Sequence, residues 1–144
     1  MVRQKKTGRI LALLIVLAMI LPTQAFAVEE RASSNIQYCV ADLSPDQDGN
    51  LHIFFSIMAS STMDDIGASS IKVQRYSGSR WITEDTLVPR NFPEMEDSDA
   101  DHLSFIIPYT PDYSGIYYRV VVSAYATNSS GTSTTSVTSR QIIA

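Results

Sequence analysis

The chain has 144 residues, of which 44% are hydrophobic and 18% charged, and its formal net charge at pH 7 is −4. These values predict a folded chain with a single domain. The acidic balance argues against a nucleic-acid partner and against an anionic membrane surface, because both are bound through clustered lysine and arginine.

The N-terminal residues have the three parts of a secretory signal peptide. Four basic side chains precede an apolar run from Ile10 to Leu21, and Ala25-Phe26-Ala27 matches the small-x-small cleavage pattern. The run has 12 residues, whereas a helix that spans a membrane needs about 20. An uncleaved anchor is the alternative. We predict a signal peptide at residues 1–27, cleavage after Ala27, and a secreted, extracellular protein with no membrane span in its mature form.

Cleavage would make the protein more acidic. The first 27 residues hold four of the eleven Lys and Arg and none of the fifteen Asp and Glu, so seven basic and fifteen acidic side chains remain and the formal charge becomes −8. A charge of this size favours solubility. A short, lysine-containing leader on a domain without disulfides is typical of a bacterial source.

Cys39 is the one cysteine of the chain, so an internal disulfide is excluded and the domain must rely on packing. It lies in an apolar, strand-like stretch from Ile36 to Ala41, which predicts a buried thiol that behaves as a small hydrophobic side chain. Intermolecular pairing and a reactive thiol are the alternatives.

The residues after the leader predict a β-protein. Residues 28–35 are polar and predict a flexible N-terminal tail. Seven strands are then predicted, at residues 36–43, 51–60, 70–76, 81–88, 102–107, 116–127 and 132–143. Turn-forming residues separate these runs, and residues 63–70 and 89–101 are predicted to be loops.

Two of the predicted strands alternate clearly. The apolar face of residues 51–60 carries Leu51, Ile53, Phe55, Ile57 and Ala59. The more apolar face of residues 116–127 carries Tyr118, Val120, Val122, Ala124 and Ala126. Phe54 and Met58 make the second face of residues 51–60 partly apolar, which predicts that this face is also partly buried. Short strands at this spacing, without an amphipathic helix, predict an all-β fold: an antiparallel β-sandwich of about seven strands over residues 36–144.

The strands from Tyr118 onward resemble the final hairpin of immunoglobulin-like and fibronectin type III domains. Tyr118-Arg119-Val120-Val121-Val122-Ser123-Ala124 gives a tyrosine after a turn and then alternating apolar residues, and Asn128, Gly131 and Ser133 mark the loop and the Ser/Thr-rich last strand. The resemblance covers about the last third of the mature chain and implies an Ig/FN3-like sandwich, which does not name a function. The whole chain also resembles small, uncharacterised proteins that Gram-positive bacteria secrete.

Two tyrosines compete for the corner position of these families. Tyr118 fits one form of it, and Ser114-Gly115-Ile116-Tyr117 is closer to the immunoglobulin form. Face polarity favours Tyr118 as the inward residue, because Arg119 shares a face with Tyr117 and would be costly to bury. The chain departs from antibody domains in its single cysteine and in Trp81, which follows a turn and does not lie within an early strand.

No catalytic constellation is found in the sequence. Nucleophilic catalysis would need a histidine base, and the two histidines, His52 and His102, both fit surface positions at strand edges. The Gly-x-Ser-x-Gly elbow of serine hydrolases does not occur. We therefore predict no enzymatic activity and no catalytic residues. A small secreted hydrolase with a pair of carboxylates is the alternative.

Acidic side chains give the one hint of a metal ion. Asp97, Asp99 and Asp101 alternate in an acidic segment, and Ca²⁺ binds several hard oxygens in flexible loops. A solvated acidic loop is the alternative, and we predict at most weak calcium binding there. Zinc is not expected, because two distant histidines and one cysteine do not form a ligand set. No cofactor is predicted.

Aromatic side chains give the best indication of function. Tyr117, Arg119 and Tyr125 fall on one face of residues 116–127 and are the candidate ligand-contact residues. Other aromatic residues that could join an exposed stacking surface are Tyr76, Trp81, Tyr109 and Tyr113. The alternatives are tyrosines that only form the sandwich rim and an Arg119 that pairs with a cross-strand acid.

These observations predict a secreted, non-catalytic binding module whose partner is a cell-surface protein or a glycan. Besides the hydrolase, the rival is a structural, self-assembling component joined through Cys39. The identity of the ligand and the oligomeric state are left open.

Overall fold

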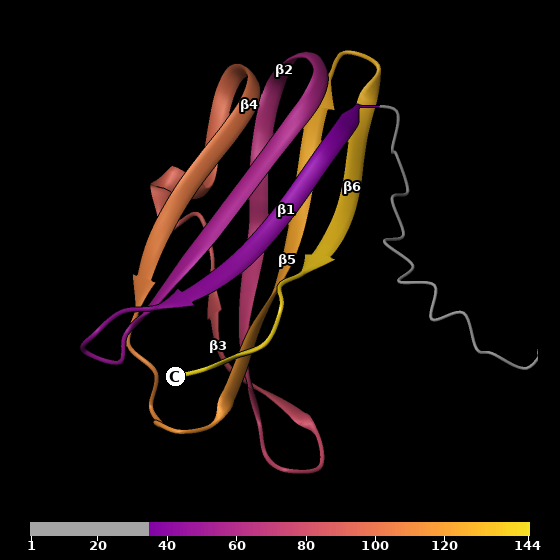
Figure 1. Ribbon diagram of the computed structural model, residues 1–144. Helices are drawn as coiled ribbons and strands as arrows, with labels where there is room; N and C mark the ends of the chain where they lie inside the picture. The colour runs from indigo at the N-terminus through magenta and orange to yellow at the C-terminus, as the bar shows by residue number, and fades with distance from the viewer. Residues whose placement is uncertain (1–34) are drawn as a thin grey trace, which may run out of the picture. The chain divides into compact units, whose positions relative to one another are not determined.

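Seven strands and one short 3₁₀ helix make up most of residues 35–144, which are the residues that the computed structural model describes. The elements are β1 (Ile36–Pro45), β2 (Leu51–Tyr76), β3 (Trp81–Leu87), η1 (Pro93–Met95), β4 (Glu96–Tyr109), β5 (Tyr117–Asn128), β6 (Gly131–Thr138) and β7 (Ile142–Ile143). Every pairing between strands is antiparallel. The predicted all-β, seven-stranded antiparallel fold is confirmed (Figure 1).

The long strand β2 belongs to two layers. Its first part pairs with β1 on one side and with β4 on the other. Its later part pairs with β5 on one side, and with the first part of β4 and then with β3 on the other. β5 pairs in turn with β6 and β7. Between the two parts, β2 turns over at one end of the fold (Figure 1), where its register with β4 shifts between Met58 and Met63. The first layer is therefore β1-β2-β4, and the second is β3-β2-β5-β6, with the first part of β4 beside β2 next to β3.

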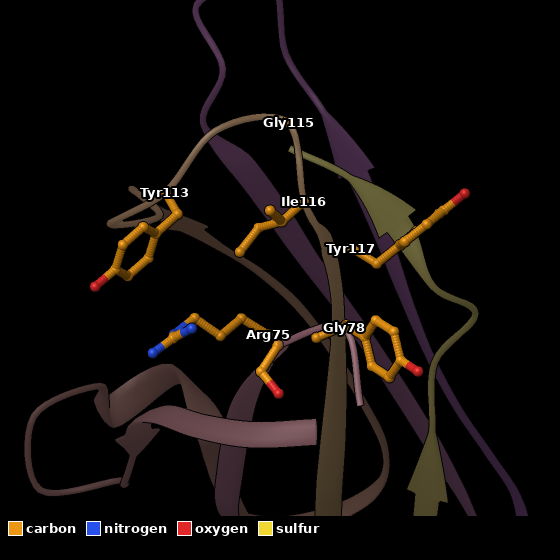
Figure 2. A pocket seen from close by; sticks show the side chains of 8 residues that line it. Arg75, Gly78, Tyr113, Gly115, Ile116 and Tyr117 are labelled. Carbon is orange, nitrogen blue, oxygen red and sulfur yellow. The ribbon is translucent and has the colours of Figure 1, made fainter. Parts of the chain in front are cut away.

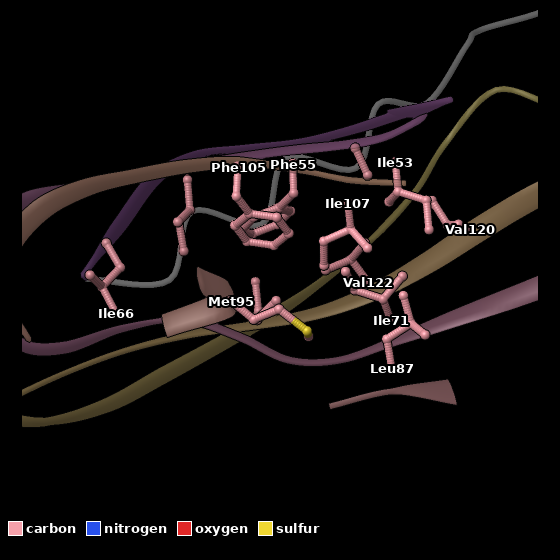
Figure 3. Packing of buried hydrophobic residues seen from close by; sticks show 14 of the residues in the cluster. Ile53, Phe55, Ile66, Ile71, Leu87, Met95, Phe105, Ile107, Val120 and Val122 are labelled. Carbon is pink, nitrogen blue, oxygen red and sulfur yellow. The ribbon is translucent and has the colours of Figure 1, made fainter. Parts of the chain in front are cut away.

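The hydrophobic core lies between these layers. The predicted inward residues of residues 51–59 are all buried, and so are the five apolar residues of β5 from Tyr118 to Ala126. Phe55 and Phe105 pack with their ring centroids 5.1 Å apart, and Figure 3 shows them across the core from Met95. Full burial of one such side chain stabilises a fold by about 1.5–3 kcal/mol. The described residues form one compact unit around this core.

The predicted loop at residues 63–70 is wrong, because these residues continue β2. Met63, Ile66 and Ala68 are buried, and the segment is paired with β4 on one side and with β5 on the other. Gly67 permits the close approach of β4, since a Cβ there would overlap the carbonyl oxygen of Met95 and lie 2.8 Å from the Cα of Glu96. Buried side chains therefore decide the local structure, although acidic and small residues at the surface suggested a loop.

Two further boundaries differ from the sequence prediction. Residues 96–101, predicted within a loop, begin β4, and residues 96–100 pair with residues 63–67 of β2. The predicted last strand at residues 132–143 is divided into β6 and β7. At this break, the Val120 N–H donates to Ser139 Oγ at 3.0 Å, which fixes the interruption against β5. The number of strands still matches the prediction. The two strands predicted at residues 51–60 and 70–76 form the single strand β2, and the one predicted at residues 132–143 forms β6 and β7.

The predicted signal peptide at residues 1–27 and its cleavage site lie outside the described residues, as does the predicted tail up to residue 34. Asn35, the last residue of that tail, belongs to the fold. It is buried, its side-chain amide donates to the Gly131 carbonyl at 3.1 Å, and its carbonyl accepts from the Ser60 N–H at 2.9 Å. Within residues 35–144, no helix has the length and apolar character needed to cross a membrane.

Candidate functional site

An open hollow of about 440 Å³ lies at the end of the second layer, where β2 finishes and β5 begins. Figure 2 shows Arg75 and Tyr113 on one side of it, Tyr117 on the other, and Ile116 between them. Its lining residues are Arg75, Tyr76, Ser77, Gly78, Tyr113, Gly115, Ile116 and Tyr117. Tyrosine supplies both apolar area and a hydroxyl group, so the hollow offers two kinds of contact to a ligand.

Two tight turns form the rim of the hollow. Gly78 and Gly115 have φ angles of 91° and 75°, values that glycine adopts without steric strain. The turn between β2 and β3 is closed by the Ser77 N–H, which donates to the Arg80 carbonyl at 2.9 Å. The Gly115 N–H donates to the Ala144 carbonyl at 2.6 Å. Backbone hydrogen bonds therefore hold both sides of the rim.

Glu84 of β3 connects the walls of the hollow. Its side chain is only 5% exposed, and its carboxylate accepts hydrogen bonds from Tyr118 Oη at 2.8 Å, Tyr109 Oη at 2.9 Å and the Asp112 N–H at 3.2 Å. Arg75 Nε lies 3.5 Å from the same carboxylate. A buried charge is tolerated when it is paired and hydrogen-bonded, and here its partners come from three strands and a loop.

A β-bulge places Glu84 among these partners. Thr83 pairs with Gln74 and Asp85 pairs with Val73, so Glu84 is an extra residue of β3 without a partner on β2. Bulges redirect the side chains beside them. Glu84 and Arg75 could not be recognised as site residues from the sequence, because neither a bulge nor a contact across strands leaves a pattern in the order of the residues.

Arg75 and Tyr118 together position Tyr113 at the rim. The guanidinium carbon of Arg75 lies 4.5 Å from the centroid of the Tyr113 ring, and the Tyr113 N–H donates to Tyr118 Oη at 3.3 Å. Tyr118 is fully buried, as face polarity predicted. Burial raises the pKa of Tyr118 well above its usual range, and its hydrogen bond to Glu84 raises it further. The phenol therefore keeps its proton at neutral pH and donates a hydrogen bond to Glu84.

A second cluster adjoins the hollow on the outer face of the same layer. The guanidinium carbon of Arg119 lies 4.3 Å from the centroid of the Trp81 ring, and Arg119 Nε donates to Gln74 Oε1 at 2.9 Å. Tyr76 packs against Trp81 with ring centroids 5.3 Å apart and also lines the hollow. The two features therefore form one surface. We call it the aromatic–arginine surface, made of Arg75, Tyr76, Trp81, Tyr113, Tyr117 and Arg119.

The three predicted ligand-contact residues share the outer face of β5. Tyr117 is 42% exposed beside the hollow. Arg119 has the cross-strand partner Gln74, where an acid was the expected alternative. Tyr125 lies farther along β5, and its hydroxyl donates to Glu96 at 3.1 Å. The structure thus brings Tyr117 and Arg119 into the aromatic–arginine surface and leaves Tyr125 outside it, and their role in binding stays a prediction.

The weak calcium candidates, Asp97, Asp99 and Asp101, are exposed on the first part of β4. Asp97 accepts a hydrogen bond from the Ser98 N–H at 2.9 Å, and Asp101 Oδ1 lies 2.8 Å from His102 Nδ1. The hydrogen bond with His102 lowers the pKa of Asp101. Within residues 35–144, no group of three His, Cys, Asp or Glu side chains is placed to hold a metal ion. These three aspartates therefore do not form a donor set in this structure.

Cys39 and the two histidines lie on three different strands of the first layer, Cys39 on β1, His52 on β2 and His102 on β4. Cys39 is half-buried on β1 opposite Ile57 and packs against the core. Burial raises the pKa of its thiol to about 11, so the reactive thiolate is scarce at neutral pH. His52 Nε2 lies 3.6 Å from Asp46, and His102 contacts Asp101. Each histidine is thus beside an aspartate and not beside the thiol.

No protein-family model, curated protein or solved structure matches this chain. The chemistry of the site follows from its own side chains. Four aromatic rings and two guanidinium groups meet at one end of the second layer. This combination suits a ligand that offers apolar area together with hydrogen-bonding or acidic groups.

Proposed function

We propose that this protein is a secreted, non-catalytic binding module that contacts a cell-surface partner through its aromatic–arginine surface. The observation that carries the proposal is the gathering of three tyrosines and Arg75 around a hollow, with Trp81 and Arg119 beside it through the contact between Trp81 and Tyr76. Tyr, Trp and Arg are the residues that most often dominate the binding energy of protein interfaces. Side chains held in place before binding also lose less entropy when a partner arrives.

We further propose that the domain is of the immunoglobulin-like or fibronectin type III-like class. A tyrosine corner supports this assignment: Tyr118 is buried at the start of β5, and its hydroxyl accepts a hydrogen bond from the backbone N–H of Tyr113, a few residues upstream. The division of the strands into a β1-β2-β4 layer and a β3-β2-β5-β6 layer is also compatible with that class.

The surface favours a protein partner over a glycan. Sugars bind by stacking on a free aromatic face, whereas the Trp81 ring is already in contact with Arg119 and Tyr76. Besides Arg75, whose charge Glu84 balances, the surface and its surroundings carry three basic residues in an acidic chain, namely Lys72, Arg80 and Arg119. Complementary charge increases the rate and the specificity of association. We therefore propose a partner protein with an acidic patch beside exposed apolar side chains.

Binding to intact cells tests this proposal. Fluorescently labelled residues 28–144 would be titrated onto bacterial and host cells and measured by flow cytometry. The Tyr113→Ala/Tyr117→Ala/Arg119→Ala variant should bind at least about tenfold more weakly, because it removes three anchors of the surface. The matched control is Thr134→Ala/Ser136→Ala, two exposed positions on β6. Equal binding by both folded variants and the wild type would contradict the proposal.

Pretreatment of the cells identifies the class of partner. Mild proteolysis of the cell surface should abolish binding, while glycosidase treatment should leave it intact. If binding survived proteolysis and was lost after glycosidase treatment, the partner would be a glycan and not a protein.

A further inference from the structure

Two cations lie side by side on the outer face of the second layer. Buried residues alternate along the later part of β2 and along β5, so the residues between them point away from the core. Lys72 and Arg119 belong to this outward set. Lys72 is opposite Val121, and Gln74 is opposite Arg119. The two cations are therefore diagonal neighbours on adjacent strands, with their backbones about 7–8 Å apart.

The register of β3, β2, β5 and their neighbours arranges this face in three rows. The first row is Thr86, Lys72, Val121 and Thr138, the second is Thr83, Gln74 and Arg119, and the third combines the pair Trp81 and Tyr76 with the pair Tyr117 and Ile143. None of these residues is acidic, although the predicted mature chain has fifteen acidic and seven basic side chains. The positive charge of the face is therefore not balanced within its own rows.

Neither cation is neutralised by another part of the described fold. Within residues 35–144, the exposed Lys72 side chain has no hydrogen bond or ion pair. Arg119 is held by Nε, which donates to Gln74 Oε1 at 2.9 Å, and by the Trp81 ring, 4.3 Å from its guanidinium carbon. Gln74 is fixed in turn by Thr83 Oγ1 at 3.3 Å. The two Nη groups of Arg119 thus stay available on a side chain that is already positioned, and guanidinium N–H groups bind carboxylates well.

The spacing of the rows matches the repeat of an extended polypeptide. Successive rows are two residues apart along the strands, which is about 6.8 Å, and an extended segment presents every second side chain at the same interval. Two successive acidic side chains of such a segment would face the rows of Lys72 and Arg119. The next side chain on that side would face Tyr76, Tyr117 and Ile143, which are exposed hydrophobic residues.

We propose that the outer face of the second layer binds an extended protein segment with the pattern acidic-x-acidic-x-apolar, in either chain direction. This inference rests on the proposed function, because it names the segment that the same surface would hold. A sulfated glycan would also be attracted by the two cations. The third row favours a peptide, since its exposed apolar side chains need an apolar partner.

Two synthetic peptides of identical composition test the spacing. Acetyl-Ser-Glu-Thr-Glu-Thr-Phe-Ser-amide has the proposed pattern, whereas acetyl-Ser-Thr-Glu-Glu-Thr-Phe-Ser-amide turns one glutamate to the opposite side. Each would be titrated into isotope-labelled residues 28–144 and followed by amide chemical shifts in NMR spectra. The spaced peptide should shift the amides of Lys72, Gln74 and Arg119, and it should bind about threefold more tightly than the isomer, as expected for one exposed ion pair. Raising NaCl from about 0.1 to 0.5 M should weaken binding.

A pair of charge variants tests the role of Lys72. Lys72→Gln should weaken binding of the spaced peptide about threefold, and it should weaken binding to cells in the same direction. The matched control is Arg90→Gln, which makes the same change of charge at an exposed position outside the three rows and should leave both affinities unchanged. Circular dichroism confirms that both variants are folded.

Four results would overturn the inference. They are no shift of these amides up to about 10 mM peptide, equal affinity for the two peptides, equal affinity in the two charge variants, and tighter binding of a heparin hexasaccharide at the same amides. The last result would assign the face to a sulfated glycan.

Binding to cells separates this inference from the proposed function. If the spaced peptide fails while Tyr113→Ala/Tyr117→Ala/Arg119→Ala still reduces binding to cells, the proposed function stands and the acidic pattern is wrong. If that triple variant binds cells as well as the wild type does, the proposed function itself is wrong.

Discussion

The hydroxyl of Tyr118 donates a 2.8 Å hydrogen bond to the carboxylate of Glu84, and this bond joins the start of β5 to the edge strand β3. Tyr118 is fully buried, and the Glu84 side chain is 5% exposed. The same carboxylate also receives a hydrogen bond from Tyr109 and lies beside Arg75. One acidic side chain thus fixes the elements that form the hollow.

Replacing Glu84 with alanine should destabilise the domain by about 2–4 kcal/mol. The change leaves two phenol groups without their acceptor and Arg75 without its counter-charge, and unsatisfied buried groups are costly. Urea unfolding followed by far-ultraviolet circular dichroism measures the effect. Glu94→Ala, at an exposed position of η1, is the matched control and should stay within about 0.5 kcal/mol of the wild type. A loss below about 1 kcal/mol for Glu84→Ala would contradict the role given to this residue.

Replacing Gly67 with alanine should cost about 2 kcal/mol or more. The new methyl group would overlap the Met95 carbonyl and push β4 away from β2, and overpacking of this kind is destabilising. The same unfolding experiment applies, with Asp64→Ala, an exposed position on the same strand, as the control. If the two variants were equally stable, β4 would not approach β2 as closely as the structure places it.

Cys39 should react slowly with alkylating reagents while the protein is folded. Burial raises the pKa of its thiol from 9.0 to about 11, so at pH 8 the folded protein should contain about a hundredfold less thiolate than the unfolded chain. The rate of iodoacetamide labelling, measured by mass spectrometry against pH, should reach its midpoint near pH 11 in the native protein. A midpoint near pH 9 would show an exposed thiol and would revive assembly through Cys39.

The raised pKa of Cys39 also predicts how the stability of the fold changes with pH. The folded state keeps the Cys39 proton more tightly, so the contribution of this group is complete below pH 9 and is lost as the pH rises toward 11. Cys39→Ser should remove this part of the alkaline loss when unfolding is compared at pH 8 and pH 11. An identical pH dependence in the variant would contradict the burial of the thiol.

Trp81 is the one tryptophan of the chain, so its fluorescence reports on the aromatic–arginine surface. Arg119→Ala removes the guanidinium group that lies 4.3 Å from the ring centroid and should raise the acrylamide quenching constant of Trp81 about twofold. Loss of this cation–π contact should lower stability by only about 0.5–1 kcal/mol. Tyr125→Phe serves as the control and should not change the quenching. Unchanged quenching in Arg119→Ala would show that Arg119 does not cover the ring.

Alternation of side chains made much of the fold predictable. The inward residues of the first part of β2 and of β5 follow from a period of two, because one face of each strand must be buried. The choice of Tyr118 over Tyr117 followed from the charge of Arg119 alone. These predictions rest on single strands, for which local sequence carries enough information.

Contacts between distant strands could not be predicted in this way. Residues 63–70 look polar and small, yet pairing on both sides makes them strand. Glu84 is aimed inward by a bulge in β3, and the three groups that donate hydrogen bonds to its carboxylate are 25 to 34 residues away along the chain. Tyr117 and Arg119 were identified from the sequence, whereas Arg75 and Glu84 of the same site required the register of β2 with β3.

Site-specific photocrosslinking is the most direct test of the aromatic–arginine surface. A benzophenone amino acid would replace Tyr117 beside the hollow and, in a control protein, Thr134 on β6. After illumination on cells, the Tyr117 probe should give one prominent crosslinked cell-surface protein, and an excess of unlabelled wild-type protein should compete it away. Crosslinking from Thr134 with equal or greater yield, or from neither position despite saturable binding, would contradict the assignment of the binding surface.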